Sequence, residues 1–166
     1  IYGLRYAALR YFNAAGAGYG IGERHEPETH LIPLVLRAIL EDGEIRIFGD
    51  DYPSKDGSCV RDYIHVIDLA DAHLKALEYI TKHDKSIMLN LGTGKGHSVK
   101  EVINIAQKIA DKEVKQKVVT RRQGDPAYLV ADNAKALSLL EWTPRYGIEE
   151  IIATAYEWHR KEIFES

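Results

Sequence analysis

The segment from Ile45 to Asp68, IRIFGDDYPSKDGSCVRDYIHVID, constrains the fold most, because it joins a strand, a turn, a polar loop and a helix start. Its first four residues favour a strand, and the Gly49–Asp51 turn ends that strand. The run Val60–Val66 then leads into a helix. Arg61 lies there beside aromatic and apolar residues, an arrangement that suits an anionic ligand with a flat ring.

Strand and helix patterns alternate along the chain, which predicts the α/β class with a small mixed sheet and packed helices. We expect strands at 7–12, 45–48, 87–91 and 114–120. We expect helices at 31–42, 66–82, 98–111, 133–140 and 147–164. The spacing of Ser98 and Glu101 predicts a capping box at the third helix. In the second helix one apolar face is expected, made of Ile67, Ala70, Leu74, Leu77 and Ile80.

The bulk composition excludes several classes of protein. The balance of 22 basic and 25 acidic residues argues against a nucleic-acid or membrane-surface protein. No run approaches the roughly 20 apolar residues of a membrane span. The length of 166 residues suits about one domain, and a single cysteine, Cys59, fits a reducing cytoplasm. We expect Cys59 to be a small buried hydrophobic residue.

Two glycine-rich stretches, 16–22 and 92–96, do not match the spacing of a dinucleotide-binding fingerprint. We interpret the second as a tight strand-to-helix turn and the first as a flexible loop on the side of an active site. The seven histidines show no His-x-x-x-His or cysteine partner pattern, so no metal site is predicted. The Asp68–Asp71 pair is interpreted as charge that favours the positive end of a helix.

The arginines are the strongest binding candidates, because a planar guanidinium forms two hydrogen bonds to phosphate oxygens at once. Arg61 follows the long loop, and Arg121 and Arg122 close the strand expected at 114–120. An ordinary solvated charge pair is an equally good interpretation of Arg121 and Arg122. Asp125, just beyond them, is a chemically sensible acceptor for a ribose hydroxyl.

Five motifs, in order along nearly the whole chain, resemble UDP-glucose 4-epimerases of the extended short-chain dehydrogenase/reductase superfamily. They are LRYFNAAGA at 9–17, HLIPLVL at 30–36, IRIFGDDYPSKDGSCVRDYIHVIDLADAH at 45–73, LNLGTGKGHSVKEV at 89–102 and RRQGDPA at 121–127. The long loop between Gly49 and Arg61 favours the 4-epimerase branch over related dehydratases and decarboxylases. The resemblance implies that residues 1–166 are the C-terminal UDP-sugar-binding domain. In that interpretation Ile1–Asn13 is a remnant of the cofactor-domain sheet, and the N-terminal Rossmann portion is missing.

The resemblance also implies roles for individual residues. Those that meet the nucleotide are His30 and Leu31 at the diphosphate and uridine, and Arg46, Ile47 and Phe48 around the uracil. The remaining substrate contacts are Arg61 and Arg122 at the phosphates, Asp125 at the ribose, and Asn13 and Tyr128 at the sugar. Phe12 is expected on the nicotinamide side of the cofactor, NAD.

The activity implied by the resemblance is an isomerase of galactose metabolism, which interconverts UDP-glucose and UDP-galactose through an NAD-dependent 4-keto intermediate. The superfamily uses a Tyr-x-x-x-Lys pair for proton transfer, and none of the ten tyrosines here has lysine four positions on. We therefore expect no catalytic residue in this chain and no activity of the chain alone. The full-length protein is expected to be a cytoplasmic homodimer.

Two alternatives stay open at this point. One is another enzyme of the same superfamily, such as an epimerase or decarboxylase acting on UDP-glucuronate. The other is a UDP-sugar-binding module without catalysis. The sequence leaves open whether N-acetylated sugars are accepted.

Overall fold

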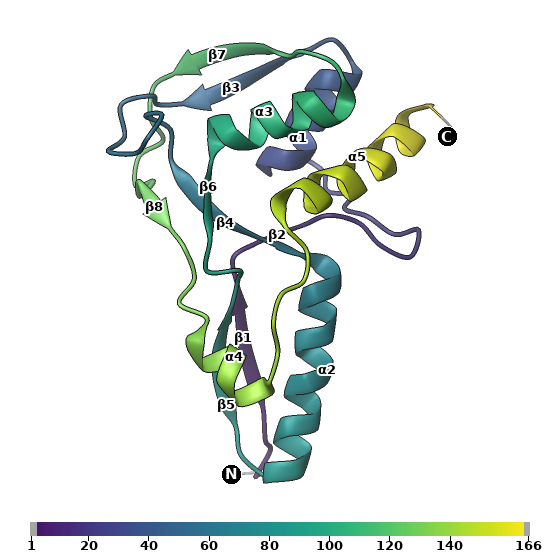
Figure 1. Cartoon of the computed structure of the whole chain (residues 1–166), viewed down its shortest axis with the longest axis vertical. Coiled ribbons are helices and arrows are strands. Elements are labelled where there is room, and N and C mark those ends of the chain that lie inside the picture. Colours follow the sequence, from purple (N-terminus) through teal and green to yellow (C-terminus); the bar gives the residue numbers. More distant parts are fainter. Residues whose placement is uncertain (1–2, 165–166) are drawn as a thin grey trace.

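The alternation of strands and helices is present in the computed structural model, which describes residues 3–164 (Figure 1). Ile1 and Tyr2, the first residues of the predicted remnant, lie outside the described residues. The helices are α1 (Leu31–Leu40), α2 (Val66–His83), α3 (Val99–Ala110), α4 (Ala134–Leu140) and α5 (Ile148–Phe164). The predicted α/β class, with small sheets and packed helices, is confirmed.

The strands form three small sheets. A parallel pair joins β1 (Ala7–Tyr11) to β5 (Ile87–Leu91), and another joins β3 (Glu44–Phe48) to β7 (Lys115–Val119). The third sheet is mixed and is built around β4 (Val60–His65). Its other strands are β2 (Asn13–Ala15) and β8 (Tyr128–Leu129), both parallel to β4, and β6 (Gly96–Ser98), which is antiparallel.

Two hydrophobic cores lie at opposite ends of the molecule, and the mixed sheet connects them (Figure 1). Helices α1, α3 and α5 pack together beside β3 in one core. Helices α2 and α4 pack against β1 and β5 in the other, where Trp142 is the largest fully buried side chain. The mixed sheet therefore crosses the region between two separately packed ends.

The prediction of which α2 face is buried is largely wrong, because that helix carries apolar side chains on two faces. Leu74 and Leu77 are 62% and 58% exposed, whereas Leu69, Ala72 and Ala76 are buried. Small side chains on the buried face allow the helix to approach β1 and β4 closely. The bulkier leucines are left on the opposite face of the helix.

The capping box predicted at Ser98 is confirmed. The Ser98 hydroxyl accepts a hydrogen bond from the Glu101 N–H at 3.0 Å, and the Glu101 carboxylate accepts one from the Ser98 N–H. This pairing satisfies two backbone donors that a helix start otherwise leaves open. Among the helices of residues 3–164, none combines the length and the apolar character of a membrane span.

Candidate functional site

A cavity of about 310 Å³ opens where β2, β3, β4 and the start of α1 meet. Nine of the ten residues predicted to contact a substrate line this cavity. They are Asn13, His30, Leu31, Arg46, Ile47, Phe48, Arg61, Arg122 and Asp125. The sequence places them far apart, and the parallel pairing of β2 with β4 and the packing of α1 on β3 bring them together.

Two of the predicted ligand contacts lie elsewhere. Tyr128 is in β8, paired with Val60, is 54% exposed and is not among the residues that line the cavity. Phe12 lies between β1 and β2, where its backbone N–H donates to the Leu91 carbonyl at 3.3 Å. A substrate in the 310 Å³ cavity would therefore reach Tyr128 only by extending past the lining residues.

Arg61 is held rigidly at the wall of the cavity. Its Nη1 donates to the carbonyls of Val60 and Pro126, both at 2.8 Å, and its Nη2 lies 3.3 Å from Asp125 Oδ1. The side chain is only 12% exposed. Because its guanidinium is fixed before any ligand arrives, little side-chain entropy would be lost when an anion binds.

Arg121 and Arg122 have different surroundings, which separates their possible roles. The guanidinium of Arg122 lies 3.9 Å above the Phe48 ring, and both residues line the cavity. Arg121 instead covers the Tyr52 ring at 4.1 Å and donates to Asp51 at 2.6 Å. Only Arg122 of this pair therefore presents its charge to the cavity.

Strand β3 divides its side chains between the core and the cavity side. Ile45 and Ile47 are 6% and 2% exposed and belong to the core, whereas Arg46 is exposed and Phe48 is half-buried. This division follows the two-residue period of a strand. A planar ligand group beside β3 would therefore meet Arg46 and Phe48 through their side chains, and Ile47 mainly through its backbone.

The buried carboxylate of Asp62 organises the segment that carries the glycine cluster. Its Oδ1 accepts from the N–H and the hydroxyl of Thr93 at 2.9 and 2.7 Å. Its Oδ2 accepts from the N–H groups of Gly94 and Ala131 at 2.9 and 3.2 Å. Two backbone donors of the 92–96 turn are thus engaged by a carboxylate of the chain itself, in agreement with the tight turn predicted from the sequence.

Asn13 is fixed by the same segment, because its Nδ2 donates to the Asp62 carbonyl at 2.7 Å. Its amide oxygen is left as the acceptor that a sugar hydroxyl would use. The close packing around the Asp62 carboxylate also requires glycine at position 92. A Cβ at Gly92 would lie 2.6 Å from Asp62 Oδ2 and 2.5 Å from the Ala131 Cβ.

Cys59 and Tyr63 also line the cavity, and both are buried. Burial raises the pKa of the Cys59 thiol, although the Arg61 charge opposes that shift. Burial likewise raises the pKa of the Tyr63 hydroxyl far above its usual value. Both groups therefore stay neutral at neutral pH, which agrees with Cys59 as a packing residue.

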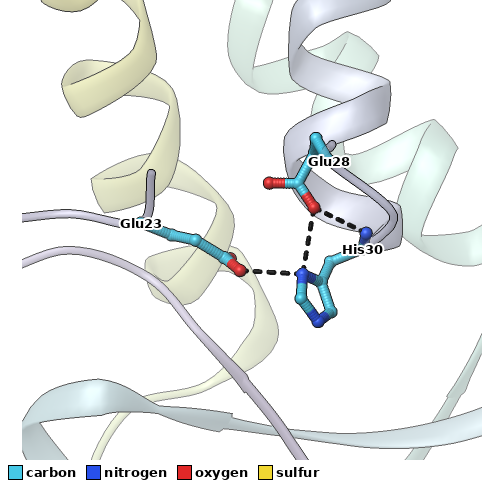
Figure 2. Close-up of side chains that lie close together, drawn as sticks. All are labelled: Glu23, Glu28 and His30. Atoms are coloured by element: carbon cyan, nitrogen blue, oxygen red, sulfur yellow. Dashed lines mark hydrogen bonds and ion pairs between the residues drawn. The ribbon is translucent and has the colours of Figure 1, made fainter. Parts of the chain in front are cut away.

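One cluster was missed by the sequence analysis. Glu23, Glu28 and His30 lie close together, and their ligand-type atoms are all within 4.8 Å of one another (Figure 2). Glu23 and His30 also line the cavity. Among residues 3–164 it is the one such group of potential metal ligands. Hydrogen bonds link its members, so the contacts need no metal. A search for paired histidines does not find a histidine paired with carboxylates two and seven residues before it.

Comparisons with known proteins agree with the sequence motifs. The family model described as "NAD dependent epimerase/dehydratase family" matches residues 1–92. A UDP-glucose 4-epimerase of Halalkalibacterium halodurans is 50% identical over 164 residues, which cover 96% of this chain and 49% of that protein. The chain thus spans about half the length of the curated relatives it matches.

Solved structures extend the agreement to the fold. A UDP-glucose 4-epimerase from Stenotrophomonas maltophila, with bound NAD and formylated UDP-arabinopyranose, superposes with a TM-score of 0.94 at 40% identity. The match covers 98% of this chain and 50% of that one. The enzyme from Bifidobacterium longum, in complex with NAD⁺ and UDP, gives a TM-score of 0.89 at 38% identity over 96% of this chain and 48% of that one.

The resemblance to UDP-glucose 4-epimerases is thus confirmed by sequence and by structure. The family match covers more than half of the chain, so this chain belongs to the NAD dependent epimerase/dehydratase family.

Proposed function

We propose that this chain is the UDP-sugar-binding part of a UDP-glucose 4-epimerase, with residues 1–166 as its binding domain. The observation that carries the proposal is the cavity in which Arg61 and Arg122 meet Phe48 and Asp125. Two guanidinium groups suit a diphosphate, an aromatic ring suits a flat base, and a carboxylate suits ribose hydroxyls.

The proposed roles are those that the resemblance implies, and the geometry of the cavity wall supports them. Arg61 has its guanidinium fixed by Pro126 and Asp125, so it would act as a preformed phosphate ligand. Arg122 lies over Phe48 and would bind the second phosphate while its partner ring contacts the uracil. Asn13, His30 and Leu31 also line the cavity and would meet other parts of the UDP-sugar.

The whole protein would interconvert UDP-glucose and UDP-galactose, with NAD accepting and returning the hydride at the sugar C4. The N–H groups of Thr93 and Gly94 in the 92–96 turn donate to Asp62, so these two donors would not be free to bind the phosphates of a dinucleotide. In this chain only Phe12 is proposed to lie near NAD. The proposed role of this chain in the reaction is to anchor UDP while the 4-keto sugar turns over.

The exposed apolar surface of the β1 end supports a missing partner region. Strand β1 pairs with β5 on one side, and its other edge pairs with no strand of residues 3–164. Tyr11 of β1, Met88 of β5, and Leu74 and Leu77 of α2 are all at least 50% exposed. Figure 1 shows these three elements at one end of the molecule. We propose that the cofactor domain continues the β1 sheet and covers this surface in a cytoplasmic, homodimeric enzyme.

Calorimetric titration of the chain with UDP tests the binding role. Saturable binding is expected for the wild type and for Arg121→Ala, because Arg121 pairs with Asp51 and Tyr52 outside the cavity. Arg122→Ala is expected to weaken binding by about tenfold or more, since a charged hydrogen bond contributes roughly 1.5–3 kcal/mol. Equal affinities of the two variants would contradict the assigned phosphate contact.

Catalysis by the chain is tested separately. We expect no conversion of UDP-glucose to UDP-galactose when NAD is added, because the sequence holds no Tyr-x-x-x-Lys pair. Measurable turnover by the purified chain would overturn this part of the proposal. In the complete protein, a preference for UDP-glucuronate over UDP-glucose would favour a different enzyme of the same superfamily.

A further inference from the structure

Two carboxylates contact the same ring nitrogen of His30. Nδ1 lies 2.8 Å from Glu23 Oε1 and 2.9 Å from Glu28 Oε1 (Figure 2). Ionised carboxylates accept hydrogen bonds and cannot donate them, so the hydrogen in this contact must be on Nδ1. The contact therefore fixes both the orientation of the ring and the position of its first hydrogen.

The two carboxylates are themselves held in place. The Glu28 side chain is 3% exposed, and its Oε1 also accepts from the N–H groups of Thr29 and His30 at 2.6 and 2.7 Å. These hydrogen bonds lower the pKa of Glu28 although burial opposes the shift. Glu28 therefore remains an anion just before the start of α1.

Glu23 is positioned from α5. Its main-chain carbonyl accepts a hydrogen bond from Trp158 Nε1 at 3.3 Å. The preceding Gly22 lies against the indole, where an added Cβ would be 2.3 Å from the Trp158 ring. Burial raises the pKa of Glu23, while the charge of His30 opposes that shift. Glu23 and Glu28 around the His30 ring, here called the carboxylate clamp, thus join the 16–28 loop, α1 and α5.

The other edge of the ring is turned away from the two carboxylates. Figure 2 shows the second ring nitrogen on the side away from both carboxylates. His30 lines the 310 Å³ cavity, whereas a second cavity, of about 240 Å³ beyond Glu23 and Glu28, is not lined by His30. Nε2 is therefore the atom presented to a ligand. The charged or titratable groups around the ring are Glu23, Glu28 and His25 on the loop side; the others that line the cavity are Arg46, Cys59, Arg61, Tyr63, Arg122 and Asp125.

We propose, building on the proposed function, that Glu23 and Glu28 are positioning residues that direct His30 Nε2 at the diphosphate, so that ligand binding takes up one proton. With Nδ1–H committed to the carboxylates, a neutral ring presents a lone pair at Nε2, which repels phosphate oxygens. An imidazolium presents Nε2–H and donates to them. The proton comes from solvent and stays on the ring while the ligand is bound.

The expected consequence is affinity that falls as pH rises. Once the free ring has lost its proton, the dissociation constant should rise by up to about tenfold per pH unit, as linkage requires for one proton taken up. UDP-glucose is the right probe, because both phosphates of its diphosphate are diesterified and its charge does not change between pH 6 and 8.5.

The experiment combines two measurements on the chain. Nitrogen-15 NMR of the free protein at high pH reads the tautomer, and the hydrogen of neutral His30 is expected on Nδ1. Calorimetry with UDP-glucose in buffers of different ionisation enthalpy counts the protons taken up between pH 6 and 8.5. Wild type is expected to take up a proton on binding, and His30→Asn to bind with no pH dependence over this range.

Two variants test the clamp itself. Glu23→Gln and Glu28→Gln are expected to weaken UDP-glucose binding and reduce proton uptake, with Glu23→Gln as the safer substitution because Glu28 also supports the α1 turn. The matched control is His97→Asn, which removes a histidine–carboxylate pair of the same length, His97 to Glu101 at 2.8 Å, outside the cavity. It should leave proton uptake unchanged.

Equal proton uptake by wild type and His30→Asn would overturn the proposal, as would a neutral ring with its hydrogen on Nε2. Absence of UDP-glucose binding by a folded chain would contradict the proposed function and, with it, proton-linked binding. The NMR spectrum tests, with or without ligand binding, whether the carboxylate clamp holds the hydrogen of neutral His30 on Nδ1.

Discussion

Arg61 Nη2 lies 3.3 Å from Asp125 Oδ1, so one ion pair joins strand β4 to the loop that follows β7. The same guanidinium donates to the Pro126 carbonyl at 2.8 Å. The two residues are far apart in the sequence, and together they form one wall of the cavity. Arg61 therefore has a structural role beside its proposed role in phosphate binding.

Arg61→Lys is expected to lower the free energy of unfolding by about 1.5–3 kcal/mol, because an ammonium cannot keep the forked contacts to Val60, Pro126 and Asp125. Urea denaturation measures the change. Arg160→Lys is the control, since Arg160 and its partner Glu157 are both at least half exposed and such pairs contribute under about 1 kcal/mol. Equal effects would show that the Arg61 contacts add little.

Asp62→Asn is expected to destabilise the chain by about 1–3 kcal/mol or more, because an amide group would face N–H donors in place of an acceptor oxygen. Thermal or chemical denaturation measures this loss. The exposed Asp50→Asn should change stability by less than about 0.5 kcal/mol. An Asp62→Asn protein as stable as wild type would mean that the 92–96 turn does not depend on this carboxylate.

Acid is expected to destabilise the chain through two buried histidines. Burial lowers the pKa of His65 and of His159 below the ordinary value of 6.5. As pH falls below 6.5 the unfolded chain takes up protons that the folded chain resists, so the free energy of unfolding decreases toward the folded pKa values. Urea denaturation at pH 7 and pH 5.5 should show this loss.

The loss should shrink in a folded His159→Gln variant, whereas replacing the exposed His83 by Gln controls for removing a surface histidine. Glu23 has a raised pKa and so contributes with the opposite sign, with stability that falls as pH rises through its folded value. A free energy of unfolding that does not change between pH 7 and 5.5 would contradict the prediction for the two histidines.

Leu74→Lys and Leu77→Lys are expected to change the stability of the isolated chain by less than about 0.5 kcal/mol, because both side chains are more than half exposed. Leu69→Ala, on the buried face of the same helix, should cost about 2–5 kcal/mol. In the complete protein the two lysine variants should be clearly destabilising if the cofactor domain covers this face. Tolerance of both lysines there would argue against that contact.

Much of the fold follows from the sequence, because the longer elements carry a readable period. Strands β1, β3, β5 and β7 have five residues each and were all expected. Strands β2, β6 and β8 have two or three residues, too few to show alternation, and exist because β4 offers them backbone partners. The sequence analysis describes the residues of β4 only as a segment that leads into α2. Five of the six residues of this strand are buried, so its sequence shows no alternation of apolar and polar residues.

The site was predicted where chemistry follows from residue type, and missed where it depends on contacts. Arginines beside an aromatic strand pointed to an anion site, and the resemblance named nine of the residues that line the cavity. Nothing in the sequence indicated that Glu23 would be brought to His30, because that contact depends on Trp158, more than a hundred positions later. The face of α2 was misjudged for a related reason, since periodicity does not tell which of two apolar faces meets the core.

The most direct test of the central claim is a crystal structure of this chain with UDP. We predict the diphosphate between Arg61 and Arg122, the uracil beside Phe48 and the ribose hydroxyls at Asp125. UDP bound away from these residues, or no binding by a chain shown to be folded, would contradict the assignment of the cavity as a UDP-sugar site.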